Sequence, residues 1–422
     1  MNNFITRICS IKNHPIKYLD YPFKVKYLKG LGGCLSKFTD NKKQIESLYK
    51  ALCLSIIDNE PDSSWLKAPD IKDISRALGI QRNGFRFFTM RKELMFDCFN
   101  FLSIVCEKDC EQMYDWLRKE YCDIFTRSLL KKVYIYLKDG INEDIIPREL
   151  LEHKKQCDNY QSQREKQILV VANVSAGKST LINALVGCRI NKAKTTACTS
   201  KLCYIYNKPV EDGILSHNHI RNEYFYTNIF ESITSDVADK ISLKFNSTFG
   251  NQKICLIDSP GFNNIDDATH RKTTEDAIKS NAYDAVIYVS NCQYFGTTDE
   301  HNLLELLKKN AKKPIIFVLN QLDRFKQKED SIGKMMCDYY ADLIKIGFES
   351  PIIIPISAQA GLLFKLSDSL LDDDDLYDKE KLKSKFQKEY YNLQSYTSQK
   401  KADATLLECS GISCLEKAIL QI

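Results

Sequence analysis

The stretch VVANVSAGKSTLINAL, residues 170–185, has the pattern of a phosphate-binding loop between a strand and a helix. An apolar run at 168–172 precedes the loop, and an amphipathic helical segment begins at Lys178. The general pattern is G-x-x-x-x-G-K-[ST], and Ala172 stands where the first glycine would be. If the backbone there needs a positive φ, the alanine is strained by roughly 1 kcal/mol or somewhat more. The strand, loop and helix together predict a nucleotide site.

The chemistry of the loop residues assigns them roles. Lys178 would bridge the β- and γ-phosphates of the nucleotide, and Ser179 would hold Mg²⁺. Gly177 allows the backbone to approach the phosphates. Successive amide groups at the helix N-terminus, from Ala176 to Thr180, would point inward and meet the negative charge.

Two further segments offer groups for the metal and the γ-phosphate. The strand in ICLIDSPGF ends at Asp258, which would hold Mg²⁺ through water, and the Gly261 amide would sense the γ-phosphate. Between this strand and the phosphate loop lies KTTACTSK, in which a threonine can reach the metal when the γ-phosphate is present. Thr199 is the first choice and Thr196 the second. The alternative is that these threonines only suit the start of a strand.

The nucleotide base is predicted from FVLNQLD and PIIIPISA, which each place polar residues at a strand end. In the pattern [NT]-K-x-D, the aspartate accepts hydrogen bonds from guanine N1–H and the exocyclic amine, which adenine cannot offer there. Asn320 and Asp323 fit this pattern, whereas Gln321 replaces the lysine that supports the phosphate loop. Ser357 and Ala358 would bring a backbone amide to the guanine oxygen. Five motifs in order, each at a strand end, predict a GTPase-type site.

The region 167–422 alternates short apolar runs with amphipathic helical segments. This alternation predicts an α/β fold, namely a P-loop GTPase domain whose mostly parallel sheet has helices on both faces. A polar, charged insert at about 365–409 precedes the last helix. Its four aspartates, 372–375, are interpreted as a solvated loop and not as a cation site, because they lack spaced ligands and a turn glycine.

The region before residue 167 has a different pattern. Residues 41–166 carry apolar side chains at helical spacing and predict an all-α N-terminal domain. Residues 1–40 are basic and rich in aromatics, without a clean period, and form a predicted N-terminal arm. The cluster Gly30, Gly32 and Gly33 is interpreted as a loop within that arm. The arm is either a packed extension or a segment that touches anionic lipid or nucleic acid.

Composition narrows the class of protein. The formal charge of +5 is too small to indicate a dedicated nucleic-acid-binding protein, so we predict no nucleic-acid partner. The 16 cysteines are scattered without a C-x-x-C pair, as expected of free thiols in a reducing cytosol. No signal peptide is apparent, and the longest apolar runs are far shorter than the roughly 20 residues of a membrane span. These features predict a cytoplasmic protein, with any membrane contact peripheral.

The motifs resemble those of the dynamin superfamily, especially its bacterial members, over about residues 165–422. The resemblance is carried by SAGKSTLINAL, ACTS, DSPGF, YDAVIYVSN, TTDEHNLLELL and GISCLEKAIL. It implies hydrolysis of GTP with Mg²⁺, stimulated when the GTPase face meets the same face of a second copy or of a related dynamin-like chain. It also implies work at membranes through peripheral contact.

The resemblance also predicts how catalysis works. Phe262 occupies the place of the glutamine that positions water in small GTPases. The resemblance instead implies that Ser175 helps to hold a charge-compensating cation. The predicted catalytic residues are therefore Ser175, Lys178 and Thr199. The polar residue that often precedes this serine is Val174 here. We therefore expect turnover that is slow or depends on a partner chain.

Three hypotheses about function remain open at this point. The first is a dynamin-like GTPase, although the sequence stops close to its last predicted helix, without the helical stalk that such proteins carry. A fragment, a stalk on a separate chain or a reduced relative would each explain that ending. The second is a regulatory GTPase switch associated with ribosomes or stress. The third is a non-catalytic, nucleotide-gated scaffold, which Ala172, Val174 and Gln321 favour.

Overall fold

The computed structural model separates the chain into two compact units. The helical unit comprises Met1–Ser162 and Pro209–Ile229, and the α/β unit comprises Gln163–Lys208 and Phe230–Ile422. The predicted GTPase region at 167–422 was continuous, whereas the structure assigns Pro209–Ile229 to the helical unit. The structure describes residues 8–9, 13–37, 42–59, 61–66, 74, 90–120, 124–190, 201–218, 224–228, 240–262, 268–293, 296–398 and 403–422.

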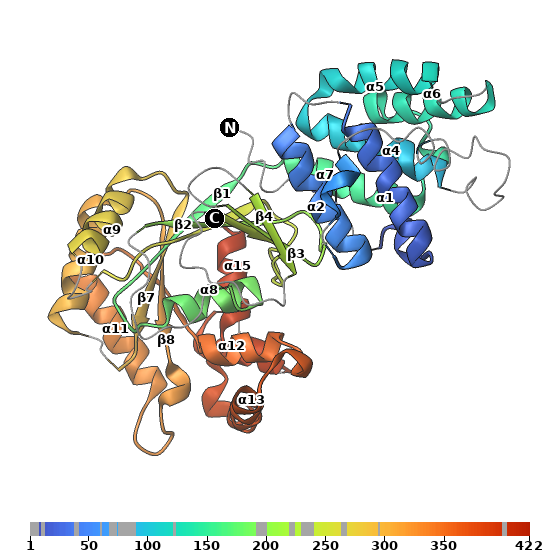
Figure 1. Ribbon diagram of the computed structural model, residues 1–422. Coiled ribbons are helices and arrows are strands. Elements are labelled where there is room, and N and C mark those ends of the chain that lie inside the picture. Colours follow the sequence, from blue (N-terminus) through green and yellow to red (C-terminus); the bar gives the residue numbers. More distant parts are fainter. Residues whose placement is uncertain are drawn as a thin grey trace. The chain divides into compact units, whose positions relative to one another are not determined.

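The helical unit is built from helices around one apolar core (Figure 1). Its helices are α1 (Tyr21–Leu35), α2 (Lys42–Ile57), α4 (Arg91–Val105), α5 (Glu107–Glu120), α6 (Ile124–Asp139) and α7 (Arg148–Ser162), with short 3₁₀ turns η2 (Pro15–Tyr18), η3 (Ser63–Leu66) and η5 (Glu143–Ile145). An antiparallel hairpin of β3 (Ile214–Asn218) and β4 (Tyr224–Asn228) packs against α2. The helices predicted between residues 41 and 166 form wherever the structure describes them. The helix start predicted at Asp70 lies outside the described residues.

The glycine cluster of the predicted arm is not a loop. Gly30, Gly32 and Gly33 lie in the buried second half of α1. A Cβ at Gly32 would come within 2.5 Å of the Trp65 carbonyl oxygen, so the absence of side chains lets the helix pack closely. The loop prediction was wrong because tertiary packing outweighs the low helix propensity of glycine.

The interior of the helical unit also holds a polar cluster. Asp97 is 1% exposed, and its carboxylate lies 3.0 Å from His14 Nε2 and accepts a hydrogen bond of 2.6 Å from the Tyr27 hydroxyl. His14 Nδ1 accepts from the Ile16 amide, which leaves Nε2 to carry a proton toward Asp97. The segment predicted as an arm is thereby tied into the core by buried hydrogen bonds, which stabilise it more than exposed ones would.

The α/β unit contains a sheet with the strand order β5-β2-β6-β1-β7-β8-β9. All neighbouring pairs are parallel except β2 and β6, which confirms the prediction of a mostly parallel sheet. The strands are β1 (Lys166–Ala172), β2 (Cys203–Asn207), β5 (Lys240–Leu243), β6 (Ile254–Asp258), β7 (Ala285–Asn291), β8 (Ile315–Asn320) and β9 (Ile352–Pro355). β1 and β7 lie in the middle, and their residues are mostly buried because both faces are covered.

Helices cover both faces of this sheet, as predicted (Figure 1). They are α8 (Lys178–Val186), α9 (Ala268–Ser280), α10 (Thr298–Asn310), α11 (Ile332–Ile346), α12 (Ala358–Lys365), α13 (Asp373–Phe386), α14 (Leu406–Cys409) and α15 (Ile412–Leu420). Helices α8, α12 and α15 lie on one side, and α9, α10 and α11 lie on the other. Because the strands are parallel, the ends of β1, β6, β7 and β8 meet at one edge.

The four aspartates of the insert begin a helix. Asp372 is the N-cap of α13 and accepts a hydrogen bond from the Asp375 amide, and the next three aspartates form the first turn. The predicted solvated loop was wrong because carboxylates at a helix N-terminus bind its free amide groups and the positive end of its dipole. Asp375 also pairs with Arg189 at 2.6 Å. Within the described parts of the chain, no helix is both long and apolar enough to span a membrane.

Candidate nucleotide-binding site

The phosphate loop connects the end of β1 to the start of α8. Ala172 is paired with Val289 of β7 and is not among the described residues with positive φ, so the strain that its position suggested is absent. The left-handed positions are instead Ser175, at φ 64°, and Gly177, at φ 86°. For serine this conformation costs roughly 1 kcal/mol, and such strain is commonly found at functional sites.

Gly177 is required for two reasons. Its φ lies in the left-handed region, which a residue with a Cβ adopts at a cost. A Cβ at this position would also come within 2.4 Å of Asn320 Nδ2. Only glycine therefore allows the loop to pass beside the predicted base-recognition residue.

Lys178 and Asp258 form an ion pair at the edge of the sheet. Lys178 is the first residue of α8, and Asp258 is the last residue of β6. Their side chains are 12% and 14% exposed, so both charges are mostly shielded but still accessible. The ammonium group predicted to bind phosphate and the carboxylate predicted to hold the metal are thus in contact.

The oxygen donors at this point fit Mg²⁺. Ser179 follows Lys178 in the first turn of α8, and its hydroxyl and the Asp258 carboxylate are the hard oxygen ligands that Mg²⁺ prefers. Among the described residues no cluster of three histidine, cysteine or acidic side chains could hold a metal alone. Phosphate oxygens and water would complete the shell, as is usual for Mg²⁺. Thr199 and Thr196 lie outside the described residues.

Asn320 joins three of the predicted motifs. It is the last residue of β8 and is 2% exposed. Its side-chain Nδ2 donates to the Ala176 carbonyl at 2.9 Å, and its Oδ1 accepts from the Ala358 amide at 3.0 Å. One buried amide group therefore fixes the phosphate loop against the segment that follows β9. Thr180 lies in the first turn of α8, as predicted.

The Ser357 and Ala358 amides already have protein partners. Ser357 caps α12, where its hydroxyl accepts from the Ala360 amide at 3.2 Å, and its own amide donates to Ser410. The Ala358 amide donates to Asn320. A contact between this amide and a guanine oxygen would have to be shared with Asn320 or replace that hydrogen bond.

Gln321 takes over the supporting role of the absent lysine. It adopts φ 69°, and its Nε2 donates to the Ser175 carbonyl at 3.0 Å. Asn291, the last residue of β7, donates to the same carbonyl at 3.3 Å. The sequence reasoning missed Asn291, although a polar residue at the end of the fully buried run AVIYVS could have indicated it. Together the two amides fix the strained part of the phosphate loop.

Asp323 lies in a short 3₁₀ turn, η7 (Leu322–Arg324), and is half-buried. Its backbone carbonyl accepts a hydrogen bond from Lys385 of α13, a residue that the sequence reasoning did not identify. The carboxylate predicted to bind guanine thus sits on a turn that is held from the C-terminal insert.

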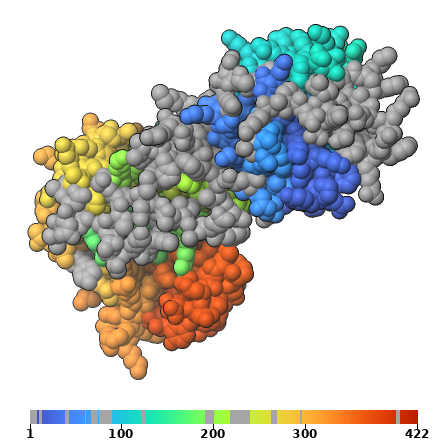
Figure 2. Space-filling model, in the orientation of Figure 1, coloured from blue at the N-terminus to red at the C-terminus, as the bar shows by residue number. Residues whose placement is uncertain are grey.

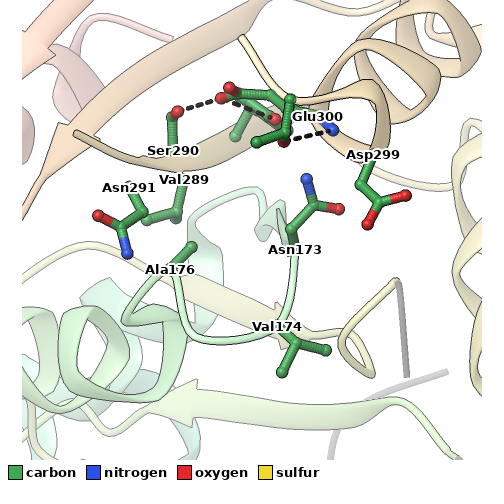
Figure 3. Close-up of a pocket in the computed structure, with 10 residues that line it drawn as sticks. Asn173, Val174, Ala176, Val289, Ser290, Asn291, Asp299 and Glu300 are labelled. Atoms are coloured by element: carbon green, nitrogen blue, oxygen red, sulfur yellow. Dashed lines mark hydrogen bonds between the residues drawn. The ribbon is translucent and has the colours of Figure 1, made fainter. Parts of the chain in front are cut away.

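A cavity of about 200 Å³ lies beside the phosphate loop (Figure 3). Its buried carboxylate is Glu300, which accepts hydrogen bonds from Ser290, from Tyr288 at 3.3 Å and from the Gly296 amide at 3.0 Å. Burial raises the pKa of Glu300, and these hydrogen bonds counter the rise. Because Glu300 is already hydrogen-bonded within the protein, we assign it to the support of the loop after β7.

Val174, which also lines this cavity, lies next to Gly261. A Cβ at Gly261 would be 3.0 Å from Val174 Cγ2. In Figure 3 the Val174 side chain points away from Asp299 and Glu300, and it is 48% exposed. The group beside the predicted γ-phosphate sensor is therefore an exposed hydrocarbon. Phe262, which follows Gly261, is buried and packs under Arg271.

Part of this chain is similar in sequence to known proteins. The family model described as "Dynamin family" matches residues 168–322. An uncharacterised protein from the xynA 3′ region of Caldicellulosiruptor sp. (strain Rt8B.4) is 25% identical over 257 residues, which cover 58% of this chain and 62% of that protein. The chain thus spans less than two thirds of that relative.

Among solved structures, a chain of an oligomerised bacterial dynamin pair, described as sensing and tethering membranes, is 17% identical, with a TM-score of 0.36. The match covers all of this chain and 62% of that one. Era from Aquifex aeolicus bound to GDP and AlF₄⁻ is 20% identical over 46% of this chain and 52% of that chain, with a TM-score of 0.29. The family match at 168–322 includes the phosphate loop, Asp258 and Asn320, so this part of the α/β unit resembles the GTPase domain of the dynamin family.

Proposed function

We propose that this protein binds GTP and hydrolyses it in a Mg²⁺-dependent reaction, and that self-association through the nucleotide face raises its turnover. The observation that carries this proposal is the position of Asn320, which binds Ala176 of the phosphate loop and Ala358 of the segment after β9. Such a bridge is what a site needs in order to hold a triphosphate and a base in a fixed relation.

The site residues divide the work of binding. Lys178 would turn from Asp258 to the β- and γ-phosphates, while Asp258 and Ser179 hold Mg²⁺. Mg²⁺ held by these residues would neutralise charge on the phosphate oxygens. Asp323 would accept from the guanine N1–H and exocyclic amine, which gives the base preference. The Gly261 amide would complete the surroundings of the γ-phosphate, and Thr199, which lies outside the described residues, is proposed beside it from its place in the sequence alone.

Hydrolysis is the step for which we propose that a partner chain is needed. Ser175 presents an exposed hydroxyl from a left-handed backbone, and it is our candidate for holding a charge-compensating cation. The neighbouring side chain, Val174, cannot orient a water molecule. A second copy, or a related dynamin-like chain, that covers this exposed valine would exclude bulk water and supply polar groups. We place this activity in the cytoplasm, with peripheral contact to a membrane, and without a nucleic-acid partner.

Phosphate release measured against protein concentration, with and without anionic liposomes, tests the proposal. We expect turnover per protein to rise with concentration, and to rise further where liposomes gather the protein. Turnover that is independent of both concentration and lipid would contradict self-activation. Co-sedimentation with ribosomes, without any effect of lipid, would favour the regulatory switch.

A nucleotide-gated scaffold is the second candidate, and the exposed Val174 is the observation that favours it. A scaffold would bind GTP tightly at every concentration and release no phosphate. Single-turnover measurements with saturating protein distinguish the two functions, because a slow enzyme still converts its bound GTP within one turnover.

A further inference from the structure

The C-terminal insert holds the loop that carries Asp323. The insert exposes α13 on the face of the α/β unit seen in Figure 2. Lys385 lies in the last turn of α13, and its ammonium group donates a hydrogen bond to the backbone carbonyl of Asp323. The 3₁₀ turn η9 (Glu389–Tyr391) adds a second contact, because the Tyr391 hydroxyl donates to the Phe325 carbonyl at 2.8 Å.

Lys385 is also positioned by a contact within the insert. Its ammonium group lies 4.6 Å from the centre of the Tyr391 ring, at the distance of a cation–π contact. Tyr391 is buried and packs against Phe386 and Tyr390. Burial lowers the pKa of Lys385, and the charge of Asp323 raises it, so the two charges interact electrostatically.

The loop that follows β8 is therefore anchored at successive points. Asn320 binds Ala176, and Gln321 binds Ser175, so these first two residues are tied to the phosphate loop. Asp323 and Phe325, further along, are tied to the insert through their carbonyl groups. The orientation of the Asp323 carboxylate depends on a turn whose backbone is held at two points. Lys385 donates to the Asp323 carbonyl, and the Leu322 amide donates to the Ile356 carbonyl at 3.4 Å.

We propose that Lys385 is a positioning residue for base recognition, and that with Gln321 it replaces the single lysine of the N-K-x-D pattern. Gln321 supports the phosphate loop, and Lys385 supplies the positive charge and orients the turn of the specificity carboxylate. This inference rests on the proposed GTP site and adds to it a residue 62 positions away from Asp323 in the sequence. The ligand class that it selects is a nucleotide with both donors of guanine.

The test compares the affinities of GTP, inosine triphosphate and ATP in the full chain. Inosine triphosphate lacks the exocyclic amine that Asp323 would bind, so the ratio of the GTP and inosine triphosphate affinities measures how well the carboxylate is oriented. Lys385→Met keeps the side-chain stem but removes the charge and the donor. Lys385→Arg retains both. Lys381→Met, at an exposed position one turn earlier in α13, is the matched control for net charge.

We expect Lys385→Met to weaken GTP binding about tenfold, the effect of roughly one hydrogen bond to a charged group. Inosine triphosphate keeps the N1–H contact to Asp323 and should lose less, about threefold, whereas ATP offers neither donor and should change by no more than about twofold. Lys385→Arg should restore most of the preference, and Lys381→Met should match the wild type. An equal loss for all three nucleotides, or an unchanged ratio, would overturn the positioning role.

Tyr391→Phe keeps the inference testable if Lys385→Met does not fold. It retains the ring beside Lys385 and removes only the hydrogen bond to Phe325. We expect a shift of the same ratio in the same direction, by about threefold. An unchanged ratio in this variant would count against the insert as the anchor. A wild-type protein that does not prefer GTP over ATP would instead contradict the proposed function itself.

Discussion

The helical unit and the α/β unit each place a carboxylate beside a nitrogen donor, but they do so differently. In the helical unit, Asp97 is 1% exposed and has two protein donors, His14 and Tyr27. In the α/β unit, Asp258 is paired with Lys178, and both side chains remain 12–14% exposed. The first arrangement is closed, with two protein groups on Asp97 Oδ2, whereas the second keeps part of its coordination accessible.

This difference separates a structural cluster from a binding site. A buried carboxylate that is closed off by protein groups is not accessible to a ligand, and removing it leaves buried donors without a partner. An accessible ion pair can exchange its partners for those of a ligand, here a phosphate for the ammonium group and a metal for the carboxylate. Mutations should therefore affect stability in the helical unit and binding in the α/β unit.

Replacing Lys178 should have the largest effect. Lys178→Ala removes the charge-assisted contacts to two phosphates, and we expect GTP binding to weaken by roughly 1,000-fold or more. The thermal stabilisation produced by GTP should disappear, because that stabilisation depends on the dissociation constant. Lys312→Ala, at an exposed lysine of the same unit, is the control. A GTP-induced shift that persists in Lys178→Ala would refute the site.

Replacing Asp97 should act on stability alone. Asp97→Ala leaves the His14 and Tyr27 groups buried without their partner, and we expect the free energy of unfolding to fall by about 3 kcal/mol. Both tryptophans of the sequence, Trp65 and Trp116, lie in the helical unit, so tryptophan fluorescence during urea unfolding reports on this unit.

GTP affinity should stay within about twofold of the wild type in Asp97→Ala, since no site residue is altered. Asp115→Ala, at an exposed aspartate of α5, should leave unfolding nearly unchanged. A loss of GTP binding in folded Asp97→Ala would show that the two units do not divide stability and binding in this way.

Acid should weaken the helical unit through His153. Burial lowers the pKa of His153 from 6.5 to about 4, so the folded chain keeps it neutral while the unfolded chain binds a proton below pH 6.5. The contribution of neutral His153 to the free energy of unfolding is fully present above pH 6.5 and is lost as the pH falls toward 4. Glu93 opposes this loss, because burial raises its pKa to about 6. Between pH 6 and 4.5 the folded chain binds a proton at Glu93 more readily than the unfolded chain, so this residue stabilises the fold as the pH falls.

We expect a net loss of roughly 1–3 kcal/mol in the free energy of unfolding between pH 7 and 4, measured by tryptophan fluorescence in urea. His153→Gln should flatten this dependence, because glutamine does not titrate. If the slope is the same in His153→Gln and in the wild type, another group controls the acid sensitivity.

The Ser175 hydroxyl should have the smallest effect. Ser175→Ala keeps the left-handed backbone position and removes only the hydroxyl, so we expect turnover to fall about tenfold with GTP affinity unchanged. Ser175→Gly removes the same hydroxyl while relieving the strain of φ 64°. Equal losses in the two variants would assign the effect to the hydroxyl. A loss in Ser175→Ala alone would assign it to the backbone.

Local patterns predicted the parts of the site that depend on neighbouring residues. Gly177, Lys178 and Ser179 follow one another at the junction of a strand and a helix, so their chemistry can be read from one short stretch. Asp258 and Asn320 were predictable because parallel strands bring their ends to one edge. By contrast, Asn291 and Lys385 act through backbone carbonyls of distant residues, and a short motif does not specify such partners.

The sequence by itself determined the α/β class, the order of the motifs and the identity of the phosphate loop, because these follow from periodicity and from residue types at strand ends. Only the tertiary structure decided that Ala172 is unstrained, that the glycines of α1 are buried in a helix, and that Lys385 reaches Asp323. The physical reason is the distance along the sequence over which each interaction acts. Periodicity and turn chemistry act over a few residues, whereas packing and hydrogen bonds to carbonyl groups join residues that only the folded chain brings together.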